Sequence, residues 1–138
     1  MQNHKPNSAR ILLVDDFEMI RIMIRDGLKH LGFTRIDEAI DGVDAIAKIK
    51  DSVAKGDHYA FVFCDWNMPN KTGLEVVLEC KSSEKLKHIP IVMVTANSEQ
   101  EKVIQALKAG ATDYIVKPIA PDMLQKKVAK ILSLLNAA

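Results

Sequence analysis

The amino-acid sequence predicts an α/β fold in which helices cover both faces of a five-stranded parallel sheet, forming a three-layer sandwich. Two observations support this prediction. Five short apolar runs recur along the chain, and each is followed by a stretch whose apolar residues repeat at helical spacing. The runs are also nearly continuous in apolar residues, which is typical of parallel strands buried on both faces.

The predicted strands are short and rich in β-branched residues. The second run carries charged residues and gives a weaker signal than the others. We expect strands at Ile11 to Val14, Arg35 to Ala39, Ala60 to Cys64, Ile91 to Thr95 and Asp113 to Val116.

The five predicted helices follow these strands in turn. Gly32 ends the first helix and Gly110 follows the fourth, because glycine readily adopts the left-handed conformation that terminates a helix. The apolar positions that define the helices are Met19, Ile20, Met23, Ile24, Leu28 and Leu31; Val43, Ile46, Ala47 and Ile49; Leu74, Val77 and Leu78; Val103, Ile104 and Leu107; and Met123, Leu124, Val128, Ile131, Leu132 and Leu135.

Length and composition fit one compact domain. The chain has 138 residues, of which 48% are hydrophobic, and a domain of this size buries about two-thirds of its unfolded-chain surface. We expect a flexible N-terminal tail at residues 1–9 and a single domain at residues 10–138. The polar stretch from Lys50 to His58 is expected to be a long surface loop.

Charge and hydropathy exclude several function classes. The formal net charge is +1, which gives no overall field to attract nucleic acid or an anionic membrane. The apolar runs are too short to span a bilayer, and the N-terminus lacks a secretory apolar region, so we expect a cytoplasmic monomer. Cys64 and Cys80 show no metal-binding or disulfide pattern and are expected to be reduced core thiols.

Five polar residues stand at or just past the ends of the predicted strands: Asp15, Asp16, Asp65, Thr95 and Lys117. In an open parallel sheet all carboxyl ends of strands lie along one edge, where ligands bind. We therefore expect these residues to converge on one acidic pocket.

Three carboxylates in one pocket raise each other's pKa values or recruit a cation, and oxygen ligands suit Mg²⁺. Lys117 adds a point charge that can pair with a carboxylate or with a phosphoryl oxygen. Thr95 adds a hydroxyl donor. An aspartate in this setting can attack a phosphoryl group and hold the acyl phosphate, and Asp65 is the best candidate nucleophile.

Each of these residues taken alone has a simpler interpretation. An aspartate at a strand end is commonly a turn or helix N-cap residue, a lysine there is commonly a surface residue, and Thr95 has good strand propensity. Suitable groups on four separate strand ends favour a functional site over coincidence.

Four sequence blocks carry a resemblance to a known family. VDDFEMIR (14–21), DWNMPNKTG (65–73), MVTAN (93–97) and DYIVKP (113–118) resemble the motif blocks of response-regulator receiver domains, and more narrowly those of the single-domain chemotaxis regulators. The match runs from about Arg10 to Leu135. The resemblance implies a flavodoxin-like (βα)₅ fold with strand order 2-1-3-4-5.

The resemblance also implies roles for individual residues. Asp65 would accept a phosphoryl group from a histidine kinase, and Thr95 and Lys117 would contact the phosphoryl oxygens. Tyr114 would change rotamer to report this event. Mg²⁺ would be held by Asp16, Asp65 and the backbone carbonyl of Asn67, with Asp15 assisting through water. The peptide bond before Pro118 would be cis.

The implied output surface is formed by the fourth helix, the fifth strand and the fifth helix. It would suit a short acidic amphipathic helix of a flagellar motor switch protein or of another output protein. Helical periodicity leaves open whether Val103 and Leu107 face this surface or pack inward. The expected surface residues are Val103, Leu107, Tyr114, Val116, Lys127 and Lys130.

Some positions depart from the chemotaxis pattern. Asn97 stands where those regulators usually have glutamate, at the border of the route for attacking water, and with Asn67 it is expected to tune dephosphorylation. Ile119 replaces a phenylalanine, and Leu107 replaces a small residue on the output surface. These departures bear on the lifetime of the phosphorylated state and on motor binding.

Three classes of function stay open on the sequence. The first is a signalling switch that is not an enzyme beyond assisting its own phosphorylation and dephosphorylation, acting by docking or as a phosphate sink. The second is an aspartyl-phosphate phosphatase of the haloacid-dehalogenase type, which needs a second aspartate where Asn67 stands. The third is a flavodoxin-like cofactor binder, whose phosphate Asp15 and Asp16 would repel.

Overall fold

The computed structural model describes residues 5–96 and 100–136 of the chain. Five parallel strands form one sheet in the order β2-β1-β3-β4-β5, with helices between them. This confirms the predicted flavodoxin-like fold and strand order. The elements are β1 (Arg10–Val14), α1 (Glu18–His30), β2 (Arg35–Ala39), α2 (Gly42–Ala54), β3 (Phe61–Asp65), α3 (Gly73–Lys81), β4 (Ile91–Ala96), α4 (Gln100–Ala109), β5 (Asp113–Lys117) and α5 (Pro121–Asn136).

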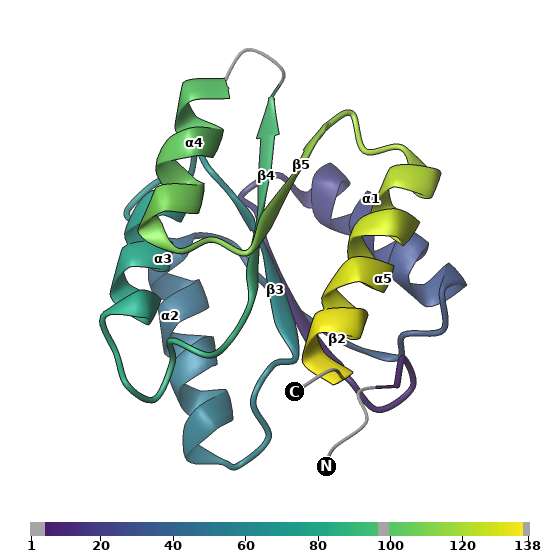
Figure 1. The fold of residues 1–138 in the computed structure, drawn as a ribbon, viewed down its shortest axis with the longest axis horizontal. Coiled ribbons are helices and arrows are strands. Elements are labelled where there is room, and N and C mark those ends of the chain that lie inside the picture. The colour runs from purple at the N-terminus through teal and green to yellow at the C-terminus, as the bar shows by residue number, and fades with distance from the viewer. Residues whose placement is uncertain (1–4, 97–99, 137–138) are drawn as a thin grey trace.

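The helices form a layer on each face of the sheet. Helices α2, α3 and α4 cover one face, and α1 and α5 cover the other (Figure 1). Because successive strand residues point to opposite faces, each central strand contributes to two cores. In β3, Phe61 and Phe63 pack with α1 and α5, whereas Val62 and Cys64 pack with α2, α3 and α4. The predicted strands are almost continuously apolar because both of their faces are buried in a core.

Strand register aligns the carboxyl ends of the central strands. Val14 of β1 pairs with Cys64 of β3, so the residues that follow each of them lie side by side. Asp65 pairs in turn with Val94 of β4, and Ala96 pairs with Lys117 of β5. We call this side of the sheet the carboxyl edge and the opposite side the amino edge.

Glycines end two helices as predicted. Gly32 follows α1 with a φ of +102°, and Gly110 follows α4 with a φ of +118°. Both angles lie in the left-handed region that glycine adopts without steric penalty.

The predicted loop from Lys50 to His58 is wrong over its first five residues, because α2 continues to Ala54. Ser52 is fully buried, and its hydroxyl donates to the carbonyl of Ile49 at 2.7 Å. A hydroxyl that bonds to its own helix can be buried without a penalty for an unmet hydrogen bond. The polar residues around it form the exposed side of a helix.

Strand boundaries differ from prediction by one residue at several ends. β3 begins and ends one residue late, so Asp65 belongs to the strand. β1 gains Arg10, β4 gains Ala96 and β5 gains Lys117, whereas β2 has the predicted bounds.

The predicted N-terminal tail is partly structured, and the predicted core thiols are buried. The flexibility of residues 1–9 stays a prediction, and residues 5–9 form a turn in which the Ser8 and Ala9 amides donate to the carbonyl of Lys5. Cys64 and Cys80 are free and buried, as predicted. Among residues 5–96 and 100–136, no helix has the length and apolar character needed to cross a membrane.

Candidate functional site

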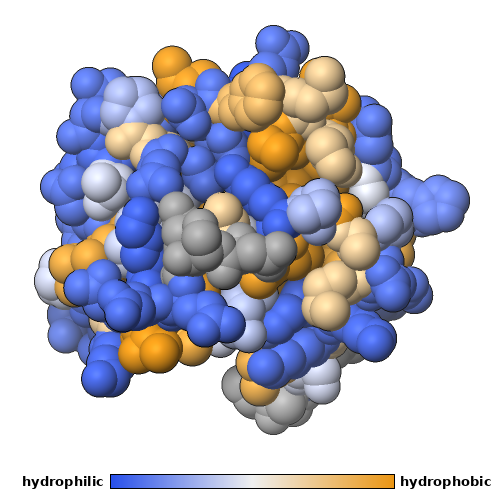
Figure 2. All heavy atoms as spheres, turned by 90° about the horizontal axis from the view of Figure 1, so that it is seen from above, coloured by the Kyte–Doolittle hydropathy of each residue, from blue (hydrophilic) through white to orange (hydrophobic). Residues whose placement is uncertain are grey.

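The parallel sheet brings the predicted site residues to the carboxyl edge. Asp15 follows β1, Asp65 ends β3 and Lys117 ends β5. Thr95 lies near the end of β4, where it pairs with Val116. Figure 2 looks onto this edge from above and shows hydrophilic side chains over much of it, with hydrophobic side chains gathered toward one side.

Three carboxylates form a cluster at this edge. Asp15, Asp16 and Asp65 each offer an oxygen, and these oxygens lie within 4.8 Å of one another. Asp15 and Asp65 are only 2% and 6% exposed, whereas Asp16 is exposed. Within the described part of the chain, Asp15 Oδ2 has no hydrogen-bond partner. Such an all-oxygen donor set fits a hard divalent cation such as Mg²⁺.

Lys117 places one positive charge against two of the carboxylates. Its Nζ donates to Asp65 Oδ1 at 3.0 Å and lies 3.6 Å from Asp15 Oδ2. Burial lowers the pKa of Lys117, but the hydrogen bond to Asp65 and the charges of Asp65 and Asp15 outweigh burial and raise this pKa above its ordinary value. Lys117 therefore carries its charge at neutral pH. The Lys117–Pro118 peptide bond is cis, as the family resemblance implies.

Burial and like charge raise the pKa of the two buried carboxyl groups. Burial raises the pKa of Asp65 to about 6, the charge of Asp15 adds to this shift, and the hydrogen bond from Lys117 opposes it. Burial also raises the pKa of Asp15, against the backbone N–H of Phe17, which donates to Asp15 Oδ1 at 2.9 Å. Strongly shifted carboxyl groups at a strand edge are typical of sites that do chemistry.

Thr95 is buried beside the cluster. Its side-chain oxygen donates to the backbone carbonyl of Ala96 at 3.4 Å, so the hydroxyl forms a long local hydrogen bond. Asn97, the position expected to tune dephosphorylation, lies outside the described residues.

Trp66 and Asn67 are the two residues after Asp65, and both lie beside Lys102 of α4. Asn67 is exposed, and its Oδ1 accepts from Lys102 Nζ at 3.4 Å. The same ammonium lies 5.7 Å from the ring centroid of Trp66, which is 7% exposed. The backbone carbonyl of Asn67, which the resemblance implies as a metal ligand, stays a prediction.

Gly73 supports Asp65 in a way that sequence reasoning missed. A Cβ at Gly73 would lie 2.3 Å from the backbone oxygen of Asp65 and 2.7 Å from Cε of Met93. The Gly73 amide also donates to the carbonyl of Trp66 at 2.9 Å. Only glycine permits this approach, and the signal available in the sequence was its place in the DWNMPNKTG block.

The predicted output surface is partly buried. Val103 is 9% exposed and packs inward, which is one of the two arrangements that periodicity left open. Leu107 is 40% exposed, and Tyr114 and Val116 are half-buried.

Asp113 joins the two lysines of this surface, which sequence reasoning did not anticipate. It is 5% exposed, and its carboxylate lies 2.9 Å from Lys127 Nζ and 3.4 Å from Lys130 Nζ. Burial alone would raise the pKa of Asp113, but the hydrogen bonds from Lys127 and the Tyr114 amide and the lysine charges lower it overall. Lys127 Nζ also lies 4.6 Å from the ring centroid of Tyr114. The charge of Lys127 is therefore partly engaged within the chain.

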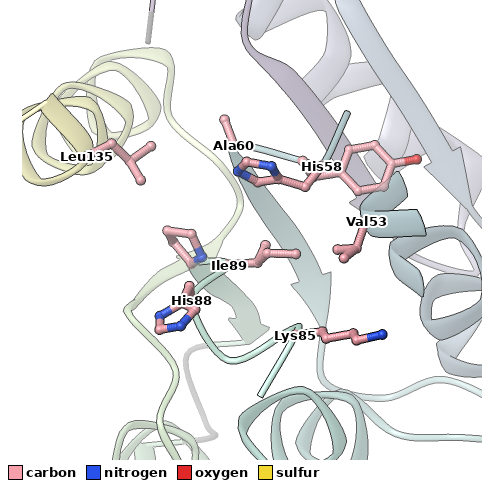
Figure 3. Close-up of a pocket in the computed structure, with 9 residues that line it drawn as sticks. Val53, His58, Ala60, Lys85, His88, Ile89 and Leu135 are labelled. Atoms are coloured by element: carbon pink, nitrogen blue, oxygen red, sulfur yellow. The ribbon is translucent and has the colours of Figure 1, made fainter. Parts of the chain in front are cut away.

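A separate cavity of about 210 Å³ opens at the amino edge, before β3 and β4. Figure 3 shows His58, Ala60, His88 and Ile89 around it, with Lys85 at one side. The residues that line it include none of the predicted site residues. His58 and His88 thus belong to a surface remote in the fold from the carboxylates.

The doubly wound sheet carries an acidic cluster, a lysine and a buried threonine at its carboxyl edge. Residues 11–129 match the family model described as the response regulator receiver domain. The chain belongs to this family, which is a family of signalling domains in two-component systems.

Within this family, the chain is similar in sequence to chemotaxis proteins. The chain is 38% identical over 127 residues to the chemotaxis protein CheY of Pseudomonas aeruginosa, covering 92% of this chain and 98% of that protein. It is 40% identical over 124 residues to the chemotaxis protein CheY-3 of Vibrio cholerae, covering 90% of this chain and 92% of that protein. The chain is thus a CheY-like receiver domain.

Solved structures agree with this assignment. The chemotaxis response regulator CheY4 of Vibrio cholerae superposes with a TM-score of 0.77 at 33% identity, covering 91% of this chain and 99% of that one. The receiver domain of NtrX from Brucella abortus gives a TM-score of 0.79 at 29% identity, and the match covers 89% of this chain and 98% of that domain. Receiver domains generally bind Mg²⁺ at an acidic pocket, interact with a histidine kinase and act on downstream targets.

Proposed function

We propose that this chain is a stand-alone response regulator whose Asp65 accepts a phosphoryl group from the phosphohistidine of a histidine kinase. The carboxyl-edge cluster carries this proposal: a buried Asp65 lies 3.0 Å from the Lys117 ammonium and shares its pocket with two further carboxylates. The CheY relatives match over nearly their whole length, which supports a CheY-like regulator.

The proposed reaction is a phosphoryl transfer between two side chains. A carboxylate oxygen of Asp65 forms a bond to phosphorus while the P–N bond of the phosphohistidine breaks. The histidine nitrogen keeps the electron pair of that bond and takes up one proton, so that the kinase side chain leaves as neutral imidazole. Asp65 must be ionised to attack, and its pKa of about 6 leaves it mainly ionised at neutral pH.

Asp15, Asp16, Asp65 and the backbone carbonyl of Asn67 would hold Mg²⁺ in this proposal. The ion would neutralise charge on the phosphoryl oxygens during transfer. The three clustered carboxylates support this assignment, as does Asp15 Oδ2, which accepts no hydrogen bond within the described part of the chain. Lys117 contributes a further positive charge that can move from a carboxylate to a phosphoryl oxygen.

Thr95 and Tyr114 would transmit the event to the output surface. Thr95 makes only a long hydrogen bond to Ala96, so its hydroxyl can turn toward a new acceptor at little cost. β4 and β5 are paired through this region, with Met93 opposite Tyr114. A change at Thr95 would then alter the packing of Tyr114, which is half-buried beside Lys127.

Chemotaxis signalling is the output that the relatives favour, since two of them are chemotaxis proteins. The output partner would be a flagellar motor switch protein or another protein that presents a short acidic amphipathic helix. Action as a phosphate sink is the alternative, because Asp113 already engages Lys127 and Lys130.

Trp66, the single tryptophan and the neighbour of Asp65, provides the test. We expect Mg²⁺ to change its fluorescence and beryllofluoride, a phosphoryl mimic, to change it further. The second response should vanish in Asp65→Asn. Unchanged emission in both titrations, or an unaltered beryllofluoride response in Asp65→Asn, would refute the proposal.

A peptide-binding measurement separates the two outputs. If the chain is a motor-type switch, beryllofluoride should raise its affinity for an acidic helical peptide from a flagellar motor switch protein. Equal weak binding with and without beryllofluoride would favour the sink or an unrelated partner.

A further inference from the structure

Arg21 of α1 links the start of the acidic cluster to the neighbouring strand. Its guanidinium Nη1 donates to the backbone carbonyl of Asp15 at 2.7 Å, and its Nε donates to Glu38 Oε1 of β2 at 2.8 Å. The side chain is 13% exposed, so these bonds are sheltered from competing water. Arg21 was not among the residues that the sequence singled out.

The carbonyl of Asp15 belongs to the peptide group that joins the two adjacent aspartates. The last sheet contact of β1 is made by the Asp15 amide, which donates to the carbonyl of Ala39 at 3.2 Å. Beyond this point Arg21 holds the backbone instead, and its own amide donates to Phe17 at 3.3 Å. The bond to Phe17 is a helical backbone bond that any residue at position 21 would make, so the restraint specific to the arginine is its side-chain bond to the carbonyl of Asp15.

Glu38 is the anchor that keeps the Arg21 guanidinium in place. Its other carboxylate oxygen accepts from Arg25, one helical turn after Arg21, and its backbone carbonyl accepts from Lys48. Glu38 is fixed in the sheet opposite Leu13 of β1. A planar guanidinium with one donor on Glu38 and another on Asp15 has little freedom to rotate.

We propose that Arg21 is a positioning residue for the cation site of the carboxyl edge. By holding the peptide group between Asp15 and Asp16, it sets the direction in which both carboxylates leave the backbone. This inference rests on the proposed Mg²⁺ site and names a residue that acts on that site from outside the ligand set. Residues of this kind typically change metal affinity about 10-fold to 100-fold when replaced.

Calorimetric titration of the full chain with Mg²⁺ tests the role directly, without phosphorylation. Arg21→Met, which keeps an unbranched apolar stem but removes the guanidinium donors, should weaken Mg²⁺ binding about 10-fold. Arg21→Lys should bind with intermediate affinity, because an ammonium can reach one acceptor but cannot bridge both as a guanidinium does. Thermal melting in EDTA shows that each variant is folded.

Arg25→Met is the matched control, since Arg25 contacts the same Glu38 carboxylate but not Asp15. We expect its Mg²⁺ affinity to stay within about twofold of the wild type, well below the effect assigned to Arg21. If Arg21→Met and Arg25→Met bind Mg²⁺ with equal affinity, the positioning role is overturned and the proposed function stays intact. If Arg21→Met does not fold, the same comparison is made with Arg21→Lys. Absence of Mg²⁺ binding by the wild type would overturn the cation site and the positioning role together.

Discussion

The two edges of the sheet use the same kinds of charged residue in opposite ways. At the carboxyl edge three carboxylates form a cluster, and two of them, Asp15 and Asp65, share the ammonium of Lys117. At the amino edge Asp37 accepts from Nε and Nη2 of Arg10 at 3.1 and 2.8 Å and from the Tyr59 hydroxyl at 2.8 Å. One carboxylate at the amino edge has several donors, whereas at the carboxyl edge two buried carboxylates share one ammonium.

The amino edge is balanced in charge as well as in hydrogen bonds. Asp57 pairs with Arg35, and the backbone carbonyl of Asp57 accepts from Arg10 at 2.8 Å. The ring of Tyr59 lies 4.6 Å from the Arg10 guanidinium carbon. Balanced charges of this kind stabilise the fold, whereas an excess of one sign is tolerated where a ligand supplies the missing charge. The difference between the edges thus separates structure from function.

The largest expected effect is the loss of phosphorylation when the acceptor at the carboxyl edge is removed. Asp65→Asn should reduce transfer from phosphoramidate to background, because an amide cannot form the acyl phosphate. Mass spectrometry of the intact protein measures the added phosphoryl group. Asp37→Asn at the amino edge should be phosphorylated as the wild type is, and a defect there would contradict the division between the edges.

Steric support of the acceptor should give the next largest effect. Gly73→Ala should lower the free energy of unfolding by about 3 kcal/mol, because the new Cβ meets the Asp65 backbone oxygen and must displace it. Urea denaturation followed by circular dichroism measures this change. A change below about 1 kcal/mol would mean that the loop after β3 relaxes easily and does not hold Asp65 rigidly.

The charge imbalance of the carboxyl edge should make Asp65→Asn more stable than the wild type in Mg²⁺-free buffer. The pKa of Asp65 is raised from 3.8 to about 6 in the folded protein. The contribution of the protonated Asp65 carboxyl group to stability is therefore fully present below about pH 4 and is lost as pH rises through about 6. The variant should therefore gain about 2 kcal/mol at pH 7.5 and nothing near pH 4. Urea denaturation at both values of pH tests this, and a gain that is equal at both would exclude charge as the cause.

The smallest expected effect is at the amino edge. Asp37→Ala should lower the free energy of unfolding by about 1.5 kcal/mol, because Arg10 and Tyr59 lose their shared acceptor at a partly exposed site. Asp51→Ala, which breaks only an exposed pair with Lys55, should cost less than about 0.5 kcal/mol. Thermal and urea denaturation measure the loss of unfolding free energy in each variant. Equal losses would mean that the contacts of Asp37 stabilise the fold no more than an ordinary exposed ion pair does.

The fold could be predicted because parallel strands leave a strong mark on sequence. Buried strands require apolar residues on both faces, and even the charged run at Arg35 to Ala39 had the predicted bounds. The loop predicted at Lys50 to His58 was wrong for Lys50 to Ala54, because polar residues conceal a helix when a hydroxyl such as that of Ser52 is satisfied by its own backbone. Composition alone does not reveal that satisfaction.

The site was predictable where residue type carries the chemistry and unpredictable where the backbone does. Asp15, Asp65 and Lys117 stand out because carboxylates and ammonium groups at strand ends have few structural reasons to gather. Arg21 and Gly73 act on backbone carbonyls, and a carbonyl is present at every position, so chemical residue type does not mark these contacts. Only the folded geometry shows them.

The burial of Cys64 and Cys80 has a practical consequence for labelling. Burial raises the pKa of both thiols, that of Cys80 to about 11, so that hardly any reactive thiolate forms at neutral pH. A cysteine introduced at an exposed position such as Ile104 on α4, which is 54% exposed, would then react selectively with maleimide or methanethiosulfonate reagents. A fluorophore or spin label could therefore be attached to this protein without first replacing its native cysteines.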